Sequence, residues 1–195
     1  MTRRWTLRLA ACLVAGTAVL TGCSEKQEAG TSLPSPVSAE PTQEELAPLG
    51  PEAFPVPAEA RAKTPDGALS FAEYYMALGV EIGQGRVPAD VLLELSTSEC
   101  RLCGQIARSF SADQAAGYTY RGNSSTFREL GAPRVEGELA EVGFIFSQSA
   151  YTVLDANGDE VPERGSQASG DLQSGMFLTW SETSSSWLVS SLTIG

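Results

Sequence analysis

The sequence predicts an α+β domain in which N-terminal helices pack on a bent antiparallel sheet. Apolar residues first recur at three- and four-residue spacing, and alternation with a period of two takes over after Gly117. Helices followed by strands, without β–α–β alternation, favour an antiparallel sheet. Seven of the eleven prolines lie between residues 34 and 57, so a Pro-rich extension precedes the domain. A chain of 195 residues has room for one domain of ordinary size and this extension.

The first helical pattern is the clearest. Thr64 is a suitable N-cap, Pro65 suits the first helical position, and the apolar face that follows predicts a helix over 65–83. We expect a shorter helix over 88–95 and a third over 99–110. The capping-box pattern of Ser111-Ala112-Asp113-Gln114 predicts one more turn, closed by Gly117.

Strand patterns fill the rest of the chain. Val142, Phe144 and Phe146 share one face, whereas Tyr151 and Val153 share the other, so we expect a bulge or bend near 147–149. Asn157-Gly158 is a strong hairpin signal. The expected strands are 118–120, 126–130, 135–154, 175–180 and 187–194.

The first helix should cover the last hairpin. Phe71 and Tyr75 are one helical turn apart, and Trp180 and Trp187 flank the last turn on neighbouring strands. We expect the helix to pack against this hairpin, which would bring the four aromatic side chains together.

Residues 1–22 have the pattern of an export signal. Arg3, Arg4 and Arg8 form a positively charged segment before an apolar run of 12 residues, Leu9 to Leu20. That run is too short to span a bilayer, which takes about 20 residues, but it suits a signal peptide. The arginine pair leaves the choice between general secretory and twin-arginine export open.

The next four residues, Leu20-Thr21-Gly22-Cys23, resemble a bacterial lipobox. The resemblance implies cleavage before Cys23 and lipidation of Cys23 with acyl chains such as palmitate. The protein would then be a lipoprotein held on the extracytoplasmic face of the cell membrane, with that membrane as its partner. An ordinary secretory signal with an incidental Cys23 is the alternative.

Residues 23–63 form the predicted linker between the lipid anchor and the domain. Seven glutamates accompany the seven prolines there, and such a composition buries too little apolar surface to fold. We therefore expect a disordered, extended tether and a folded domain over 64–195. Within the tether, Pro51–Pro57 is expected to dock on the domain, because Phe54 and Val56 are apolar.

Two resemblances follow from these motifs. Three helices, then a long bent sheet that ends in a strand, a polar turn and Trp187-Leu188-Val189, look like the nuclear transport factor 2 (NTF2)-like cone. More narrowly, Pro51–Pro57, the helix around Phe71, the Cys100-Arg101-Leu102-Cys103 sequence and the Trp187 strand resemble an uncharacterised domain family of actinobacterial lipoproteins. The resemblance covers about residues 51–195 and implies no activity, because that family has none assigned.

Composition removes several classes of function. The chain has no histidine, which excludes Ser-His-Asp and Cys-His catalysis and His-ligated metal sites. A net charge of −11 argues against nucleic acid as a partner. We expect no cofactor and no metal. Acids around Asn157-Gly158 resemble a Ca²⁺ loop only loosely, because glycine and glutamate are misplaced for an EF-hand.

Cys100 and Cys103 stand in a C-x-x-C motif. Two ligands are too few for a structural zinc site, and an exported protein meets an oxidising compartment. We expect a structural disulfide. The alternative is a thiol–disulfide active site, although no β–α–β pattern precedes the motif.

The leading functional hypothesis is a non-catalytic module that binds a small apolar ligand or an envelope partner. The alternative is an enzyme on the same fold that uses pocket tyrosines and a carboxylate with a raised pKa. Its candidate residues are Tyr74, Tyr75, Tyr118, Tyr120 and Tyr151 with Glu136 or Glu138.

The lipobox gives the first testable prediction. Cys23→Ala removes the thiol that would carry the lipid, so the variant should leave the membrane fraction or accumulate as an uncleaved precursor. Detergent phase separation followed by blotting measures this. A variant that partitions like the wild type would contradict the lipoprotein hypothesis.

Overall fold

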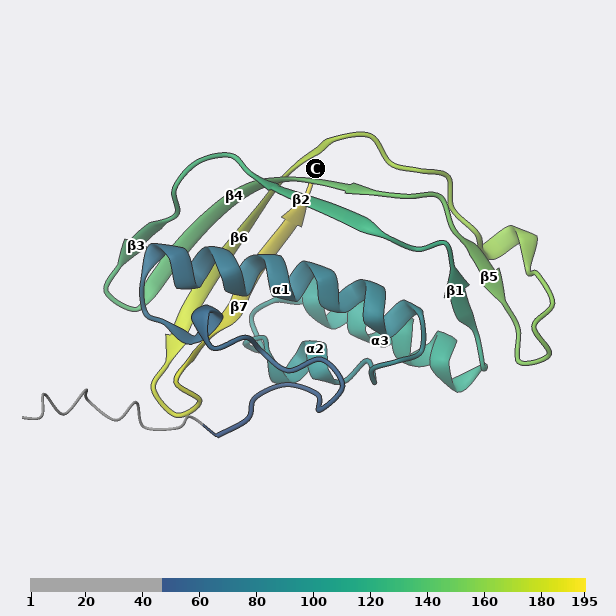
Figure 1. The fold of residues 1–195 in the computed structure, drawn as a ribbon, viewed down its shortest axis with the longest axis horizontal. Helices are drawn as coiled ribbons and strands as arrows, with labels where there is room; N and C mark the ends of the chain where they lie inside the picture. The colour runs from purple at the N-terminus through teal and green to yellow at the C-terminus, as the bar shows by residue number, and fades with distance from the viewer. Residues whose placement is uncertain (1–46) are drawn as a thin grey trace, which may run out of the picture. The chain divides into compact units, whose positions relative to one another are not determined.

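The computed structural model describes residues 47–195, which belong to one compact unit. A bent antiparallel sheet arches over three helices, so the fold is α+β as predicted, with the helices on the concave side (Figure 1). Helices on the concave side of a bent antiparallel sheet are the arrangement that the sequence indicated. The predicted signal peptide, Cys23 and most of the predicted linker lie outside the described residues.

Helix α1 (Pro65–Gly83) has the predicted bounds. The Thr64 side chain accepts a hydrogen bond from the Gly67 amide, and Pro65 stands at the first helical position, as the sequence indicated. Its buried face includes Ala68, Phe71, Tyr75 and Leu78. Within residues 47–195 no helix has both the length and the apolar character that a membrane crossing needs.

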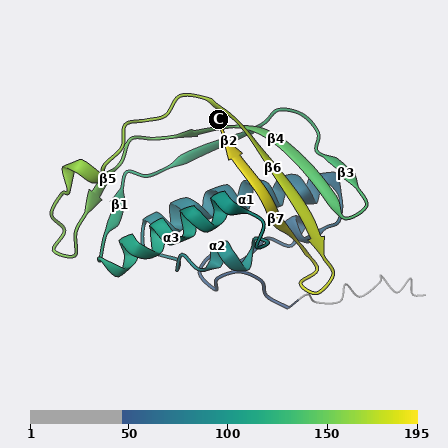
Figure 2. The ribbon, with the colours of Figure 1, turned by 180° about the vertical axis from the view of Figure 1, so that it is seen from behind.

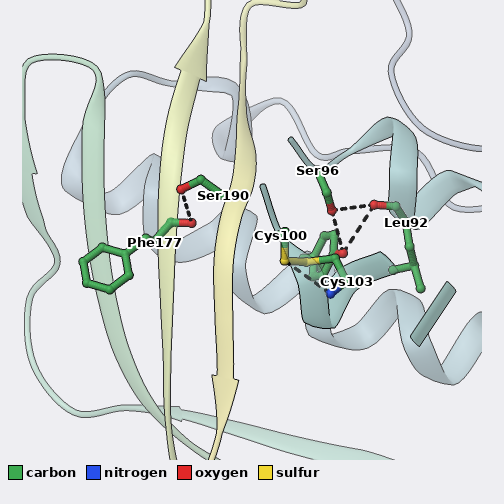
Figure 3. Close-up of a disulfide and its surroundings, with 7 residues drawn as sticks. Leu92, Ser96, Cys100, Cys103, Phe177 and Ser190 are labelled. Carbon is green, nitrogen blue, oxygen red and sulfur yellow. Dashed lines mark hydrogen bonds between the residues drawn. A yellow bond between two sulfur atoms is a disulfide. The ribbon is translucent and has the colours of Figure 1, made fainter. Parts of the chain in front are cut away.

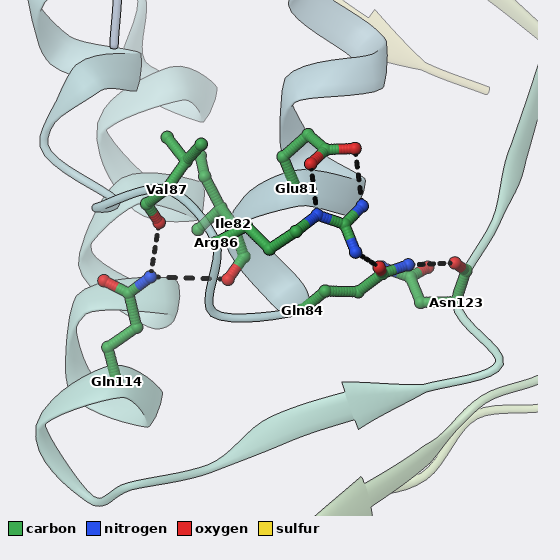
Figure 4. Close-up of polar contacts among 7 residues, drawn as sticks. All are labelled: Glu81, Ile82, Gln84, Arg86, Val87, Gln114 and Asn123. Carbon is green, nitrogen blue, oxygen red and sulfur yellow. Dashed lines mark hydrogen bonds and ion pairs between the residues drawn. The ribbon is translucent and has the colours of Figure 1, made fainter. Parts of the chain in front are cut away.

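The other helices depart from their predicted bounds. Helix α2 (Val91–Glu94) is shorter than the predicted 88–95, whereas α3 (Arg101–Ala115) runs beyond the predicted end at Phe110. Residues 111–114 therefore continue α3 and do not start a new turn. The reason is tertiary: the Gln114 amide donates to the carbonyls of Ile82 and Val87, which ties the end of α3 to the end of α1 (Figure 4).

The main sheet is antiparallel throughout and has the order β2-β4-β6-β7, with β3 also paired to β4. A separate two-stranded sheet joins β1 and β5. The strands are β1 (Thr119–Arg121), β2 (Ser125–Glu129), β3 (Arg134–Glu136), β4 (Leu139–Gln148), β5 (Thr152–Leu154), β6 (Leu172–Ser181) and β7 (Ser186–Ile194).

The predicted strand over 135–154 is three strands. Gly137, at φ +62°, makes the turn between β3 and β4, and residues 149–151 separate β4 from β5. The expected bend near 147–149 is close to this second break, where the chain leaves the main sheet to pair with β1. Val142, Phe144 and Phe146 are buried on one face of β4, as predicted.

The Asn157-Gly158 turn differs from the predicted two-residue hairpin. Asp155 Oδ1 accepts hydrogen bonds from the Asn157 and Asp159 amides, at 2.8 and 3.0 Å. Of the two turn residues only Gly158 has a positive φ, whereas the predicted turn type requires it at both. The Asp155 side chain thus builds a local turn, which leads to a short 3-10 helix, η2 (Pro162–Arg164).

The packed unit includes residues that the sequence assigned to the linker. The Phe54 ring stacks on Tyr74 with centroids 5.1 Å apart, so the Pro51–Pro57 segment docks as expected. Next to it, the 3-10 helix η1 (Glu59–Arg61) lies against α1 and β7. The buried Trp187 indole donates to the Ala62 carbonyl at 2.9 Å. The folded part therefore extends N-terminally beyond the boundary expected at residue 64.

The contact predicted between α1 and the last hairpin is corrected in part. Helix α1 lies against β2 and β4, while α3 and η1 pack against β7; Figure 2 shows the β7 side. The long helix therefore lies toward the β2–β4 side of the sheet and not against its last hairpin. Trp180 and Trp187 are partners across β6 and β7, edge to face, with ring centroids 5.2 Å apart, as predicted.

The disulfide joins Cys100 and Cys103 at the start of α3. Their Cα atoms are 5.3 Å apart, and Cys100 Sγ accepts a hydrogen bond from the Cys103 amide, so Cys100 caps the helix (Figure 3). The Cys100 amide in turn donates to the Thr97 carbonyl. The bond therefore fixes the turn between α2 and α3.

Removal of a large buried side chain from α1 should lower the stability of the domain substantially. Phe71 is fully buried between Tyr74 and Tyr75, so Phe71→Ala should cost about 3–5 kcal/mol of unfolding free energy. Urea denaturation measures it. Phe177→Ala is the matched control, because Phe177 is 53% exposed on β6. Equal stabilities for the two variants would contradict the packing of α1 on the sheet.

The cysteine pair should be oxidised in the purified protein. Cys100 and Cys103 are 3% and 1% exposed, so a mild thiol reductant should open the bond slowly. Alkylation of the native protein, digestion and mass measurement of the peptide test this. Two alkylated cysteines without added reductant would contradict a structural disulfide.

Candidate functional site

A cavity of about 170 Å³ lies between the helices and the concave face of the sheet. Residues from α1, α2, α3, β2, β4 and β7 line it, so elements far apart in the sequence contribute to one site. Most of them are apolar, and none carries a charge. The apolar wall includes Met76, Leu92, Ile106, Phe110, Phe146 and Leu192.

Gly79 opens the helix side of this cavity. It stands in the interior of α1, and a Cβ built there would meet no other atom within 4 Å. Glycine in a helix interior lowers stability by roughly 1 kcal/mol relative to alanine. In the sequence, Gly79 is only one position of the apolar helical pattern over 65–83. That it leaves part of the cavity without a side chain is evident only from the structure.

Tyr75 is the candidate tyrosine that lines the cavity. Its hydroxyl donates to the Leu92 carbonyl at 3.3 Å and lies 2.8 Å from Ser96 Oγ; Figure 3 shows Ser96 and Leu92 beside the disulfide. Burial raises the pKa of Tyr75 to about 12, which the Ser96 hydrogen bond partly opposes. The hydroxyl is thus neutral near pH 7 and holds α2 in place.

The predicted carboxylates lie elsewhere. Glu136 and Glu138 are exposed at the turn between β3 and β4, and Glu138 is 3.9 Å from the Lys63 ammonium. Tyr74 donates to the Phe54 carbonyl at 2.8 Å, and burial raises its pKa to about 12. The structure therefore does not bring the proposed tyrosine and glutamate pair together at the cavity.

The remaining candidate tyrosines form a different cluster. The Tyr120 and Tyr151 rings stack with centroids 4.8 Å apart, and the Tyr120 hydroxyl donates to the Asp113 carboxylate. Arg164 pairs with the same carboxylate and lies 4.7 Å from the Tyr118 ring centroid. Burial, and then the Asp113 hydrogen bond, raise the pKa of Tyr120. This cluster joins the small β1–β5 sheet to α3.

The pairing of Asp113 with Arg164 was not predicted. The two residues are separated by 51 positions, and the sequence places Asp113 in a capping-box pattern. No local signal could have found the pair, because it depends on the path of the chain from β5 through η2 to the end of α3.

Within the described residues, neither the Asn157-Gly158 loop nor the cysteine pair has the features of a metal or redox site. Asp155 accepts backbone hydrogen bonds within its own turn, and these lower its pKa. Residues 47–195 contain no group of three or more side chains able to hold a metal ion. Cys100 and Cys103 are buried, which keeps their sulfur atoms from an attacking thiolate.

Comparisons with known proteins find similarity only among solved structures and only at low identity. No protein-family model matches the sequence, and no curated protein matches it. Among solved structures, the intermembrane space region of the chloroplast protein ARC6 is similar over 67% of this chain and 95% of its own, with 13% identity and a TM-score of 0.48. An NTF2-like superfamily protein from Salmonella enterica serovar Typhimurium shares 14% identity over 66% of this chain and 92% of its own, with a TM-score of 0.36.

A third similar structure is a domain of unknown function with a cystatin-like fold from Nostoc punctiforme. It shares 12% identity over 66% of this chain and 76% of its own, with a TM-score of 0.36. At these identities and TM-scores no function and no family membership pass from these proteins to this chain.

Proposed function

We propose that this protein binds a small apolar molecule in the cavity under the sheet, without catalysing a reaction. The observation that carries the proposal is an uncharged, mostly apolar cavity at the centre of the fold. Such a lining takes the apolar surface of a ligand out of water, and it holds no carboxylate, lysine or cysteine that could act as a base beside the Tyr75 and Ser125 hydroxyls.

The cavity has the size of a single ring. An engineered protein cavity of about 150 Å³ lined by apolar side chains stays dry and binds benzene. At about 170 Å³ this cavity is comparable, so a ring of six atoms with a short substituent fits its volume.

We further propose that the binding domain works at the cell envelope. The charged N-terminus, the apolar run and the lipobox before Cys23 support a lipid anchor on the extracytoplasmic face of the membrane. The resemblance to actinobacterial lipoproteins supports the same location. A neutral apolar molecule is the kind of ligand that partitions into a membrane and reaches a domain held beside it.

A variant that fills the cavity tests the proposed function. Gly79→Leu projects a side chain into the empty space beside α1, so binding of a ring-sized molecule such as ethylbenzene should weaken at least tenfold. The same change should leave Tm unchanged or raise it, because leucine is a far better helix former than glycine. Calorimetric titration and thermal unfolding measure the two effects.

The control is the same substitution in another helix. Gly104 lies in α3 and does not line the cavity, so Gly104→Leu should bind ethylbenzene like the wild type. If Gly79→Leu and the wild type bind equally well, or if the wild type does not bind at all, the cavity is not the binding site.

A further inference from the structure

We infer that the ligand is a neutral molecule with an apolar body and one hydrogen-bond donor, such as a hydroxyl group, which contacts Gln148 and Ser125. This inference rests on the proposed function, since it assigns a chemical class to the ligand of the same cavity. Three observations support it: the cavity lining carries no charge, Ser125 and Gln148 lie at one end of the cavity, and the Gln148 side chain is held in one orientation.

The lining excludes a charged ligand. None of the residues around the cavity is Asp, Glu, Lys or Arg. An ion that enters loses its hydration, and without a partner of opposite charge that loss costs several kcal/mol. The ligand is therefore neutral.

One end of the cavity is polar. Ser125 on β2 and Gln148 on β4 both line it, and they stand directly opposite each other in the β2–β4 ladder. Directly opposed residues point to the same face of the sheet, with Cβ atoms about 5 Å apart. The polar end is thus a cross-strand pair on the concave face, beside the otherwise apolar wall.

The Gln148 side chain is held in one orientation. Its Nε2 donates to Asn123 Oδ1 at 2.8 Å, and Asn123 is only 4% exposed. The Asn123 carbonyl in turn accepts from Gln84 Nε2 at 2.9 Å, which fixes this loop to the end of α1 (Figure 4). One of the two hydrogens on the Gln148 amide nitrogen is therefore engaged, and the carbonyl oxygen of the same amide is left as an acceptor for a ligand.

The Gln148 carbonyl oxygen determines that the ligand carries a hydrogen-bond donor. Within the described residues neither Gln148 Oε1 nor Ser125 Oγ takes part in a side-chain hydrogen bond. A carbonyl oxygen only accepts, whereas a serine hydroxyl both donates and accepts. A ligand hydroxyl would donate to Gln148 and accept from Ser125, which satisfies both side chains.

The other polar group of the lining does not compete for this role. The Tyr75 hydroxyl is already bonded to Leu92 and Ser96. The ligand's donor therefore belongs at the β2–β4 end, and its apolar body lies along Met76, Ile106 and Leu192.

Three molecules of nearly equal shape test the inference on the full chain. Benzyl alcohol has a donor, anisole has only an acceptor and ethylbenzene has neither; benzoate and benzylammonium supply the two charges. Calorimetric titration gives each Kd for the wild type, Gln148→Met and Ser125→Ala. Thr126→Val is the matched control, because Thr126 is the next residue of β2 and bonds Ser147 on the opposite face.

Gln148→Met keeps the volume and removes the acceptor, so benzyl alcohol should bind roughly two- to tenfold more weakly. Ethylbenzene and anisole should bind equally well or better. Ser125→Ala should show a smaller loss of the same selectivity, and Thr126→Val none. If Gln148→Met does not fold, the ratio of benzyl alcohol to ethylbenzene affinity in Ser125→Ala decides.

The outcomes separate this inference from the proposed function. Equal losses for benzyl alcohol and ethylbenzene, or tighter binding of either ion than of benzyl alcohol by the wild type, overturn the donor assignment but leave an apolar binding site. Absence of binding by all five molecules overturns the proposed function and this inference with it.

Discussion

The packing of α1 against the concave face of the sheet is the contact on which the rest of the structure depends. The helix buries Ala68, Phe71, Leu78 and Ile82 along its length, and both of its ends are tied to other parts of the chain. At its start η1 lies against it, and Ala62 accepts a hydrogen bond from Trp187 in β7. At its end Gln114 bonds the carbonyls of Ile82 and Val87. Because α1 is held at both ends, it does not pack fully into the bend of the sheet. The space left between them is the cavity.

The bend itself depends on where β4 ends. After Gln148 the chain leaves the main sheet, and β5 pairs with β1 instead. The stacked Tyr120 and Tyr151 rings and the shared Asp113 carboxylate hold that small sheet against α3. A cluster that resembles a catalytic constellation in composition therefore has a structural role. It closes one end of the domain, while the uncharged cavity lies under the main sheet.

The sequence predicted what depends on local chemistry. The bounds of α1 follow from Thr64, Pro65 and the apolar period, and the inward face of β4 follows from alternation. It failed where distant residues decide. Gln114 extends α3 because Ile82 and Val87 offer carbonyls, and Asp155 replaces the expected hairpin with its own turn. The proposed binding site belongs to this second group. Ser125 and Gln148 face each other only through the β2–β4 register, and no spacing in the chain marks Asn123 as the group that orients Gln148.

The stability cost of the cavity supports a functional reading. A domain of this size is stable by only about 5–15 kcal/mol. A glycine in the interior of α1 lowers that by roughly 1 kcal/mol, and a void lined by apolar atoms loses further packing energy. The disulfide offsets part of this, since closure of so short a loop contributes about 2 kcal/mol in the chain-entropy model.

One leucine at position 79 would remove both the glycine and much of the void without meeting another atom at its Cβ. Because a more stable sequence lies a single substitution away, a cavity of this size with an oriented amide at one end favours the proposed binding role over imperfect packing.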